Sequence, residues 1–333
     1  MNRSFRITCR SDKLMITLLT VLIIGYSVSS GSVQNGFARK VSVVTVSESS
    51  AIITVHYINV GQGDSILIDT PDKDVLIDGG PTDEGQTVVN YLGSFGITHI
   101  FLVIATHVHE DHVGGLVAVL SSLTVDQVLI NGQTSNSTTY TDFMKLAQSH
   151  VITVAQRGQT YTIAEAVNLT VFNPVQPLQF ADPNDNSIVV KLQAGSTSFL
   201  FEGDAEAAAE QSMLVAGLNL QSKVLKVGHH GSNTSTTQPF LDTVAPEYAI
   251  ISAGKNDSYG HPSPQTVQKL LNKGVILYGT FQSGTIVAST DGASIAFRDN
   301  PQQIPEIHSS IALPMFMMAT LLTAIVYAKK RST

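Results

Sequence analysis

Short apolar runs separated by turns dominate the first part of the chain. Three of them follow one another closely, at residues 51–60, 65–69 and 74–80. Gly-Gln-Gly and Pro-Asp turns divide these runs, which is typical of β-strands. The pattern of 87–96 is helical and ends at a glycine, whereas 100–106 is an unbroken apolar run, as in a strand buried on both faces. A helix is predicted over 112–123, directly after that strand.

The second half of the chain repeats this alternation. Further strands are predicted at residues 168–174, 187–193, 196–204, 222–228, 248–254 and 275–280. Helices are predicted at residues 205–217 and 263–274. Two comparable halves, each with strands and helices, predict an α/β fold in which helices cover two facing sheets, a four-layer αββα sandwich. Without an internal repeat or a low-complexity linker, residues 51–299 are expected to form one domain.

Both ends of the chain carry apolar runs outside this domain. Residues 14–24 follow four basic residues and precede a small, polar stretch, so residues 1–30 are predicted to be a signal peptide or an N-terminal anchor. Residues 309–328 are uncharged, long enough to cross a bilayer and followed by a basic tail. The Pro-Glu element before them resembles archaeal sorting signals, so this transmembrane helix is either retained or replaced by another anchor. We therefore expect an exported domain tethered to the membrane at its C-terminus.

Charge and cysteine content narrow the class of partner. Residues 31–308 hold 12 Lys and Arg against 25 Asp and Glu, a formal charge of −13, compared with −7 for the whole chain. Non-specific nucleic-acid binders usually carry a basic surface, and this composition does not favour one. The single cysteine, Cys9, lies in the predicted signal, so the exported domain has neither a disulfide nor a thiolate metal ligand.

A cluster of metal-binding residue types follows the buried strand. In the sequence THVHEDH, His107 and His109 come just past the strand, and Asp111 and His112 begin the next helix. Alternate residues of an extended segment project the same way, so the first two histidines can hold one ion together. Asp111 and His112 can turn toward a second ion. Imidazoles and carboxylates suit Zn, Mn or Fe, and two ions about 3.5–4 Å apart form a clamp for hydrolysis of phosphate esters or amides.

HVHEDH, with Asp204 after a strand and a later histidine, resembles the HxHxDH signature of the metallo-β-lactamase superfamily. Further segments are similar to a narrower branch: VHYINVGQGDSILID (55–69), LIDGG (76–80), DNSIVVKL (185–192), FLFEGD (199–204), LKVGHHGS (225–232) and YGHPS (259–263). They resemble the extracytoplasmic nuclease-like domain of the competence DNA-uptake (ComEC) family. This resemblance covers residues 52–298, does not extend to the channel portion of that family, and implies a hydrolase with the four-layer αββα fold.

The resemblance also implies roles for individual residues. Asp204 would bridge two divalent ions, Zn or Mn. His229 matches the last metal ligand best, and its neighbour His230 is expected to support a ligand or contact substrate, although the HHGS motif does not separate the two. His261 would lie over the site, where it binds a phosphoryl oxygen or acts as a general acid, unless it is a structural turn residue.

One element of the superfamily pattern is missing. A third histidine usually binds the first metal, but His150 is the only histidine in that interval and it ends a predicted helix. The resemblance implies Asp185, Asn186 or water in its place, an oxygen-rich first site that favours Mn over Zn. Asp64 and Asp78 lie beside glycines at strand ends, where they either satisfy loop amides or orient ligand imidazoles.

The leading hypothesis is a dinuclear metal-dependent hydrolase that cleaves phosphodiesters outside the membrane. A metal-activated water, oriented by Asp111, would attack phosphorus while His261 or His230 stabilises the developing charge. DNA is one candidate substrate through the resemblance, and the acidic balance leaves a small phosphodiester or a phosphorylated glycan open. Two alternatives are hydrolysis of a carbonyl ester or lactone on the same ions, and a surface protein that binds without turnover. No protein partner is identifiable.

Overall fold

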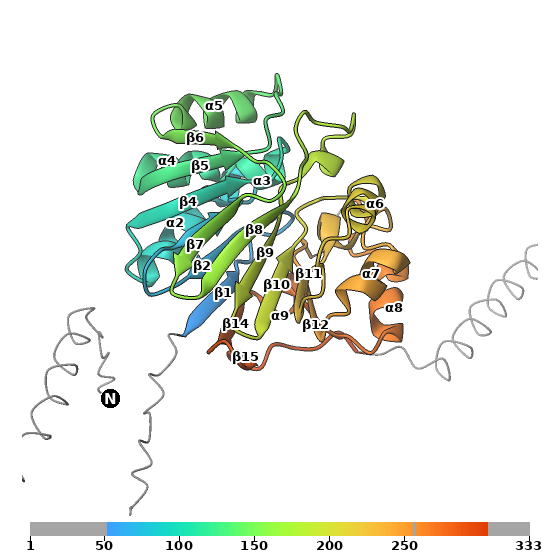
Figure 1. Ribbon diagram of the computed structural model, residues 1–333. Helices are drawn as coiled ribbons and strands as arrows, with labels where there is room; N and C mark the ends of the chain where they lie inside the picture. Colours follow the sequence, from blue (N-terminus) through green and yellow to red (C-terminus); the bar gives the residue numbers. More distant parts are fainter. Residues whose placement is uncertain (1–51, 256–257, 306–333) are drawn as a thin grey trace, which may run out of the picture. The chain divides into compact units, whose positions relative to one another are not determined.

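The computed structural model describes residues 52–255 and 258–305, whose strands form two mixed sheets (Figure 1). The first sheet holds, from edge to edge, β15 (Ile295–Phe297), β14 (Ile286–Thr290), β1 (Ile53–Tyr57), β2 (Ile66–Asp69), β3 (Val75–Ile77), β4 (His99–Ala105), β5 (Thr124–Ile130) and β6 (Val151–Val154). The second sheet holds β13 (Ile276–Gly279), β12 (Tyr248–Ile251), β11 (Val224–Lys226), β10 (Thr197–Phe201), β9 (Val189–Ala194), β8 (Val167–Asn173) and β7 (Thr160–Ala164).

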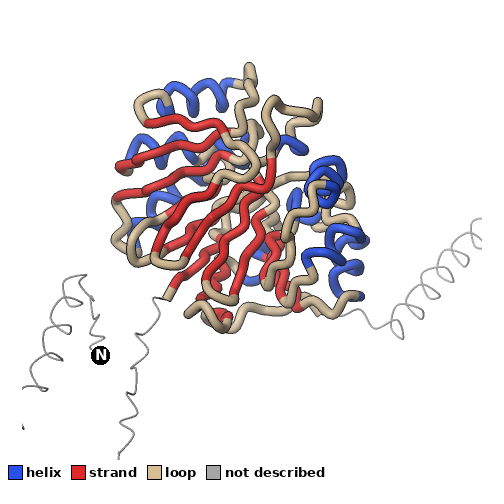
Figure 2. Tube along the Cα trace, in the orientation of Figure 1, coloured by secondary structure: helices blue, strands red, loops and turns tan. Residues whose placement is uncertain are grey.

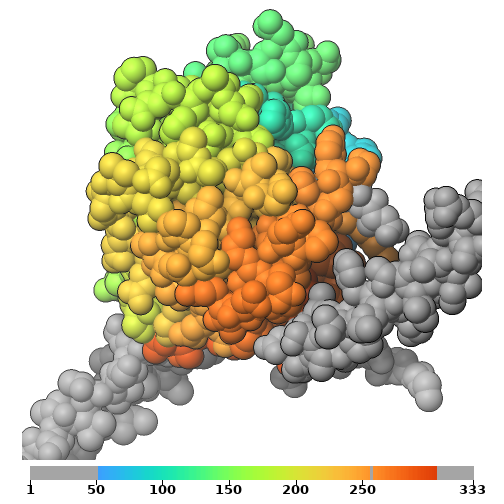
Figure 3. Space-filling view, turned by 90° about the vertical axis from the view of Figure 1, so that its right-hand side faces the viewer, coloured from blue at the N-terminus to red at the C-terminus, as the bar shows by residue number. Residues whose placement is uncertain are grey.

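Helices cover the outer face of each sheet. On the first sheet these are α2 (Gly85–Ser94), α4 (Leu116–Ser122) and α5 (Thr138–Ala147). On the second sheet they are α6 (Ala207–Val215), α7 (Gln238–Val244) and α8 (Pro264–Asn272), which form the near face in Figure 3. Short helical turns complete the order: η2 (Thr82–Glu84), α3 (Glu110–Val113), η3 (Asn184–Asn186), η4 (Gly228–Gly231) and α9 (Thr280–Ser283). The strands therefore lie between two helical layers (Figure 2), which confirms the predicted four-layer αββα sandwich.

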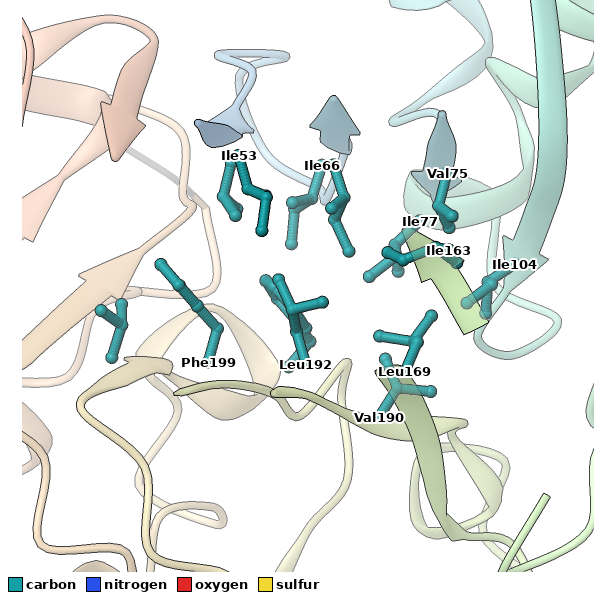
Figure 4. Packing of buried hydrophobic residues seen from close by; sticks show 14 of the residues in the cluster. Ile53, Ile66, Val75, Ile77, Ile104, Ile163, Leu169, Val190, Leu192 and Phe199 are labelled. Atoms are coloured by element: carbon teal, nitrogen blue, oxygen red, sulfur yellow. The ribbon is translucent and has the colours of Figure 1, made fainter. Parts of the chain in front are cut away.

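The strands are apolar on both faces because each face packs against a different layer. In β2, Ile66 and Ile68 join the core between the sheets, while Leu67 between them joins the core under the helices. β10 does the same, with Phe199 facing the opposite sheet and Leu200 facing the helices. Figure 4 shows the side chains of the two sheets meeting in the central core. Each buried side chain of this kind contributes about 1.5–3 kcal/mol, and this double burial explains the unbroken apolar runs.

Each sheet has one parallel part, and the two parallel parts position the site. In the first sheet β3, β4, β5 and β6 run parallel. In the second sheet the parallel strands are β10, β11, β12 and β13. Parallel strands end at the same edge of a sheet, where α/β proteins place their ligands. The loops after β3, β4, β10 and β11 gather in this way.

The helix predicted over 112–123 is divided in the structure. It forms α3 and α4, with a break at the glycine pair before Leu116. A Cβ on Gly115 would lie 1.9 Å from the carbonyl oxygen of Gly79, and the Gly115 amide donates to the carbonyl of Gly80. The break thus lets the loop after β4 touch the loop after β3, and both loops carry site residues.

Several elements were not anticipated by the pattern of the sequence. They are β5, β6, β7, α7, α9, β14 and β15. Within the described ranges, no helix combines the length and apolar character needed to cross a membrane. The predicted signal or anchor at 1–30 and the helix at 309–328 lie outside the described residues, so both stay predictions.

The contact between the two glycine loops generates a stability prediction. Gly115→Ala should lower the free energy of unfolding by about 1–3 kcal/mol, because the added methyl must push two backbone segments apart. Urea unfolding of the folded protein measures the change. Gly93→Ala is the matched control, since no atom lies within 4 Å of its added Cβ and the helix α2 should gain about 0.5–1 kcal/mol. Equal unfolding midpoints for the two variants would contradict the steric account.

Candidate metal centre

The first part of the site begins where the parallel strands β3 and β4 end. Asp78 follows β3 in a left-handed conformation (φ 57°) and accepts hydrogen bonds from the amide (2.8 Å) and hydroxyl (2.7 Å) of Thr106, which follows β4. Its other contact is with Nδ1 of His112, at 2.8 Å. Because that nitrogen donates to the carboxylate, Nε2 of His112 is turned toward the interior of the site. Asp78 therefore orients a predicted metal ligand, one of the two roles expected for it.

His107 and His109 lie side by side after β4. His107 is buried, and its Nδ1 lies 3.1 Å from the hydroxyl of Thr106, which leaves Nε2 facing its neighbour. Nε2 of His107 and Nδ1 of His109 are 3.0 Å apart. Two imidazole nitrogens at this distance either share a proton or bind one cation, and the predicted pairing of these residues is thus present in the structure.

Asp204 brings the second sheet into the site. It follows β10, is almost fully buried, and places Oδ2 at 3.2 Å from Nε2 of His112 and 3.7 Å from Nε2 of His107. Its Oδ1 makes no hydrogen bond within the described residues, although it lies 3.5 Å from Nε2 of His230. A buried carboxylate between imidazoles of both sheets has the position predicted for a bridging ligand.

The turn after β11 carries two histidines in strained backbone conformations. His229 (φ 45°, ψ 51°) and His230 (φ 52°, ψ 22°) are both left-handed, which costs about 1–2 kcal/mol for each residue other than glycine. Hydrogen bonds over-determine this turn: the His229 amide donates to the carbonyl of Gly203, and the Gly228 amide donates to the carboxylate of Glu202. Strain held in this way is typical of a functional site.

The turn sends the two imidazoles in different directions, which differs from the arrangement expected if His229 were the last ligand. His230 is buried, and its Nε2 lies 3.2 Å from Oδ2 of Asp111 and 3.3 Å from Nε2 of His112. Its Nδ1 donates to the carbonyl of Ser252 at 3.0 Å. His229 instead donates Nδ1–H to Glu206 at 2.8 Å and keeps Nε2 3.8 Å from Asp204. The structure therefore places His230, rather than His229, in the group of the last ligand.

A buried ion pair supports His230 from behind. Lys226, at the end of β11, has no exposed surface and pairs with Oδ2 of Asp64 at 2.7 Å. Oδ1 of Asp64 lies 3.5 Å from Nδ1 of His230. Burial alone would raise the pKa of Asp64, but the charges of Lys226 and His230 outweigh it and lower the pKa. Asp64 thus stays ionised and faces a ligand imidazole, one of its two expected roles.

The buried carboxylates of this cluster need positive charge beside them. Burial lowers the pKa of His112 and His230, but carboxylates, led by Asp204, outweigh burial and raise both pKa values well above normal. Burial raises the pKa of Asp204, yet these same imidazoles bring it well below its usual range. Burial and the nearby His112 charge keep the pKa of His107 low. Protons on imidazoles or bound cations can supply this charge.

The residues fit two adjacent divalent ions. One group joins His107, His109 and Asp204, and a second joins Asp111, His112, Asp204 and His230, with ligand atoms within 4.8 Å of one another in each. Asp204 belongs to both groups, and all donors are imidazole or carboxylate, as Zn and Mn accept. A third group, Asp64, Asp78 and His112, is already satisfied by the contacts to Lys226 and Thr106.

Asp185 was expected to replace the missing third histidine, but it does not belong to either ligand group. Its Oδ1 accepts hydrogen bonds from the amides of Glu206 (3.2 Å) and Ala209 (3.0 Å) at the start of α6. Unpaired amides at a helix start favour such an acceptor, which explains its orientation. Asn186 is also occupied, because its amide group donates to the carbonyls of Phe180 and Asp182.

Other histidines lie away from the centre. His56 contacts Thr54 and Tyr91 under α2, and burial, with the charge of Arg298, lowers its pKa to about 4. His99 pairs with Asp126, and His150 contacts the carbonyl of Val125. Their contacts are with residues outside both ligand groups.

A cavity of about 690 Å³ opens over the centre. Asp111, Asp204 and His230 line it, as does the predicted residue His261, whose ring centroid is 5.3 Å from that of His229. Sequence reasoning missed three residues of this region: Lys226, Glu206 and Tyr259. A lysine inside the apolar run of β11 was the one available signal, because a charged residue in a buried strand requires a partner.

Comparison with solved structures gives neighbours of low sequence identity. The metallo-beta-lactamase fold protein YhfI from Bacillus subtilis is 12% identical, with a TM-score of 0.47 over 72% of this chain and 100% of that chain. A metal-dependent hydrolase of the beta-lactamase superfamily is 12% identical, with a TM-score of 0.47 over 68% of this chain and 95% of that chain.

Curated relatives are more similar in sequence. ComE operon protein 3 of Bacillus subtilis is 31% identical over 70% of this chain and 32% of its own length. Competence protein ComA of Neisseria gonorrhoeae is 31% identical over 72% of this chain and 32% of its own length. Their similarity to this chain confirms the resemblance to competence proteins of the ComEC family. The chain spans about a third of the length of these relatives. The profile of the metallo-beta-lactamase superfamily matches residues 58–255, which contain every residue of both ligand groups, and the chain belongs to that superfamily.

Proposed function

We propose that this chain is a dinuclear metal-dependent phosphodiesterase that acts outside the membrane. The observation that carries the proposal is the pair of ligand groups that share Asp204, a residue that lines an open cavity. The basic and apolar N-terminal stretch supports export, and the apolar run at 309–328 with its basic tail supports a tether. Divalent ions bound there would supply an activated water and neutralise charge on phosphoryl oxygens.

Asp111 is the residue best placed to orient the attacking water. Its side chain is 30% exposed, faces the cavity, and lies 3.2 Å from His230 through Oδ2. Burial would raise the pKa of Asp111, but His112 and His230 outweigh it and bring the pKa below its usual range. The ionised carboxylate accepts a hydrogen bond from water. Attack at phosphorus breaks one P–O ester bond, the leaving oxygen takes up a proton, and a phosphomonoester and an alcohol result.

Two imidazoles outside the ligand groups favour phosphorus over a carbonyl carbon. His229, held through Nδ1 by Glu206, and His261 line the cavity beside the centre. A phosphoryl group has one more charged oxygen than a carbonyl ester, and these rings can contact it. Among the described residues that line the cavity there is no Lys or Arg. A short phosphodiester therefore fits better than a polymer bound along its backbone.

Replacement of the shared carboxylate tests the catalytic proposal. Asp204→Asn should lower hydrolysis of bis-p-nitrophenyl phosphate with added Mn or Zn by about a thousandfold, because charge neutralisation at the centre is worth several kcal/mol. Release of p-nitrophenol measures turnover, and the thermal shift on adding metal reports binding separately. Full turnover by the variant would contradict a shared metal centre. Turnover of a lactone but not of the diester by the wild type would overturn the choice of phosphorus.

The two adjacent histidines should differ in their effect on metal content. His230→Ala should reduce the metal bound per chain by one ion, because His230 closes the group with Asp111 and His112. His229→Ala should keep the metal content, because the nearest polar contact of His229 is Glu206. It should lower turnover, because the ring that contacts the phosphoryl group is lost. Elemental analysis of the dialysed proteins measures the bound metal. Loss of an ion in His229→Ala alone would restore the order of roles expected from the sequence.

Salt dependence separates a short substrate from a bound polymer. Between 50 and 200 mM NaCl, kcat/KM for a single-stranded oligonucleotide should change by less than ~3-fold, whereas a protein with 6–10 phosphate contacts loses about 10³–10⁵ in affinity. Bis-p-nitrophenyl phosphate is the control for effects of salt on the metal centre. A loss of ~100-fold for the oligonucleotide alone would indicate a basic track outside the cavity.

A further inference from the structure

One large aromatic side chain departs from the burial pattern of the domain. Tyr259 is 77% exposed, whereas most large apolar side chains of the described residues are packed in the three cores. It lies between β12 and α8 and lines the same cavity as Asp111, Asp204 and His230. An exposed aromatic ring that lines the cavity of a candidate catalytic centre is placed where a ligand can contact its face.

The rings on this wall form a series that leads to the centre. Tyr259 stacks on His261 with ring centroids 6.0 Å apart and an interplanar angle of 24°. His261 meets His229 edge to face, with centroids 5.3 Å apart and an angle of 68°. Nε2 of His229 is in turn 3.8 Å from Oδ2 of Asp204. A ligand whose phosphate reaches the centre can therefore lay a neighbouring group along flat aromatic surface.

The other described residues that line the cavity provide no basic side chain to bind a substrate. Asp83, Glu84 and Glu110 line it, and no Lys or Arg does so among the described residues. A polyanion gains nothing from such a lining outside the ions, because phosphate affinity normally comes from Lys and Arg. Binding energy for the organic part of a substrate must then come from non-ionic contacts, and stacking on an aromatic side chain can supply about 1–3 kcal/mol per base.

We propose that Tyr259 is a stacking platform for a planar ring carried by the group next to the scissile phosphate. This inference rests on the proposed function, since it names the class of phosphodiester that the centre would cleave: one with a nucleobase or another aryl substituent. Stacking uses the π-face that all such rings share, so it selects rings without reading their edges.

Binding measurements on the full-length, Mn-loaded protein test this platform. Calorimetry compares two ring-bearing ligands with planar aromatic rings, thymidine 5′-monophosphate and phenyl phosphate, with 2-deoxyribose 5-phosphate as the ring-free ligand, whose sugar has no planar aromatic ring. Tyr259→Ala should reduce the affinity ratio of ring-bearing to ring-free ligand by about tenfold, the usual cost of losing one stacked base. Tyr259→Phe should keep the ratio because the ring is retained. Tyr259→Leu should lose it, because the side chain is apolar but not flat.

Each outcome bears on the proposal. A loss of preference for thymidine 5′-monophosphate alone identifies a nucleobase, and a loss for both ring-bearing ligands identifies planar rings in general; either supports the platform. An equal change for all three ligands, or a leucine variant as selective as phenylalanine, would overturn it. Circular dichroism checks that the variants fold. Absence of bis-p-nitrophenyl phosphate turnover in the wild type would defeat the proposed function, while the affinity ratio would still decide the role of Tyr259.

Discussion

The contact of one buried carboxylate with imidazoles from both sheets is the constraint on which the site depends. Asp204 follows a strand of the second sheet, yet its Oδ2 lies 3.2 Å from Nε2 of His112 and 3.7 Å from Nε2 of His107, which both follow a strand of the first sheet. An unpaired buried carboxylate costs several kcal/mol, so neither sheet can shift relative to the other without exposing that cost. Two other features position ligand residues around Asp204. One is the glycine contact between the loops after β3 and β4, and the other is the strained histidine turn.

Much of the fold was predictable because burial on two faces leaves a clear trace in the sequence. Some of the missed elements are at the margins, because β6 and β7 are edge strands with partly exposed side chains. Others, such as β5 and β14, lie inside the first sheet, and polar residues interrupt their apolar runs. Predicted strands also ran too far at their carboxyl ends. The surplus residues, such as Asp78 and Asp204, are the site loops, whose glycines and apolar neighbours resemble strand.

Site residues that are close together in the sequence were predictable, whereas contacts between residues distant in the sequence were not. HVHEDH places four ligand-type residues within six positions, so their grouping needed no tertiary information. The pairing of Lys226 with Asp64, and of His229 with Glu206, joins residues that only the topology brings together. The orientations of His229 and His230 follow from a left-handed backbone at both residues. Such a backbone is predictable from sequence mainly where glycine occurs, and neither residue is a glycine.

The buried pairing of Lys226 with Asp64 has a consequence for the metal-free protein. The pair lies behind the centre, with Oδ1 of Asp64 3.5 Å from Nδ1 of His230. Because Lys226 and Asp64 pair within the protein, the support behind His230 does not depend on a bound ion. We therefore expect this part of the site to keep its arrangement when the metal is removed.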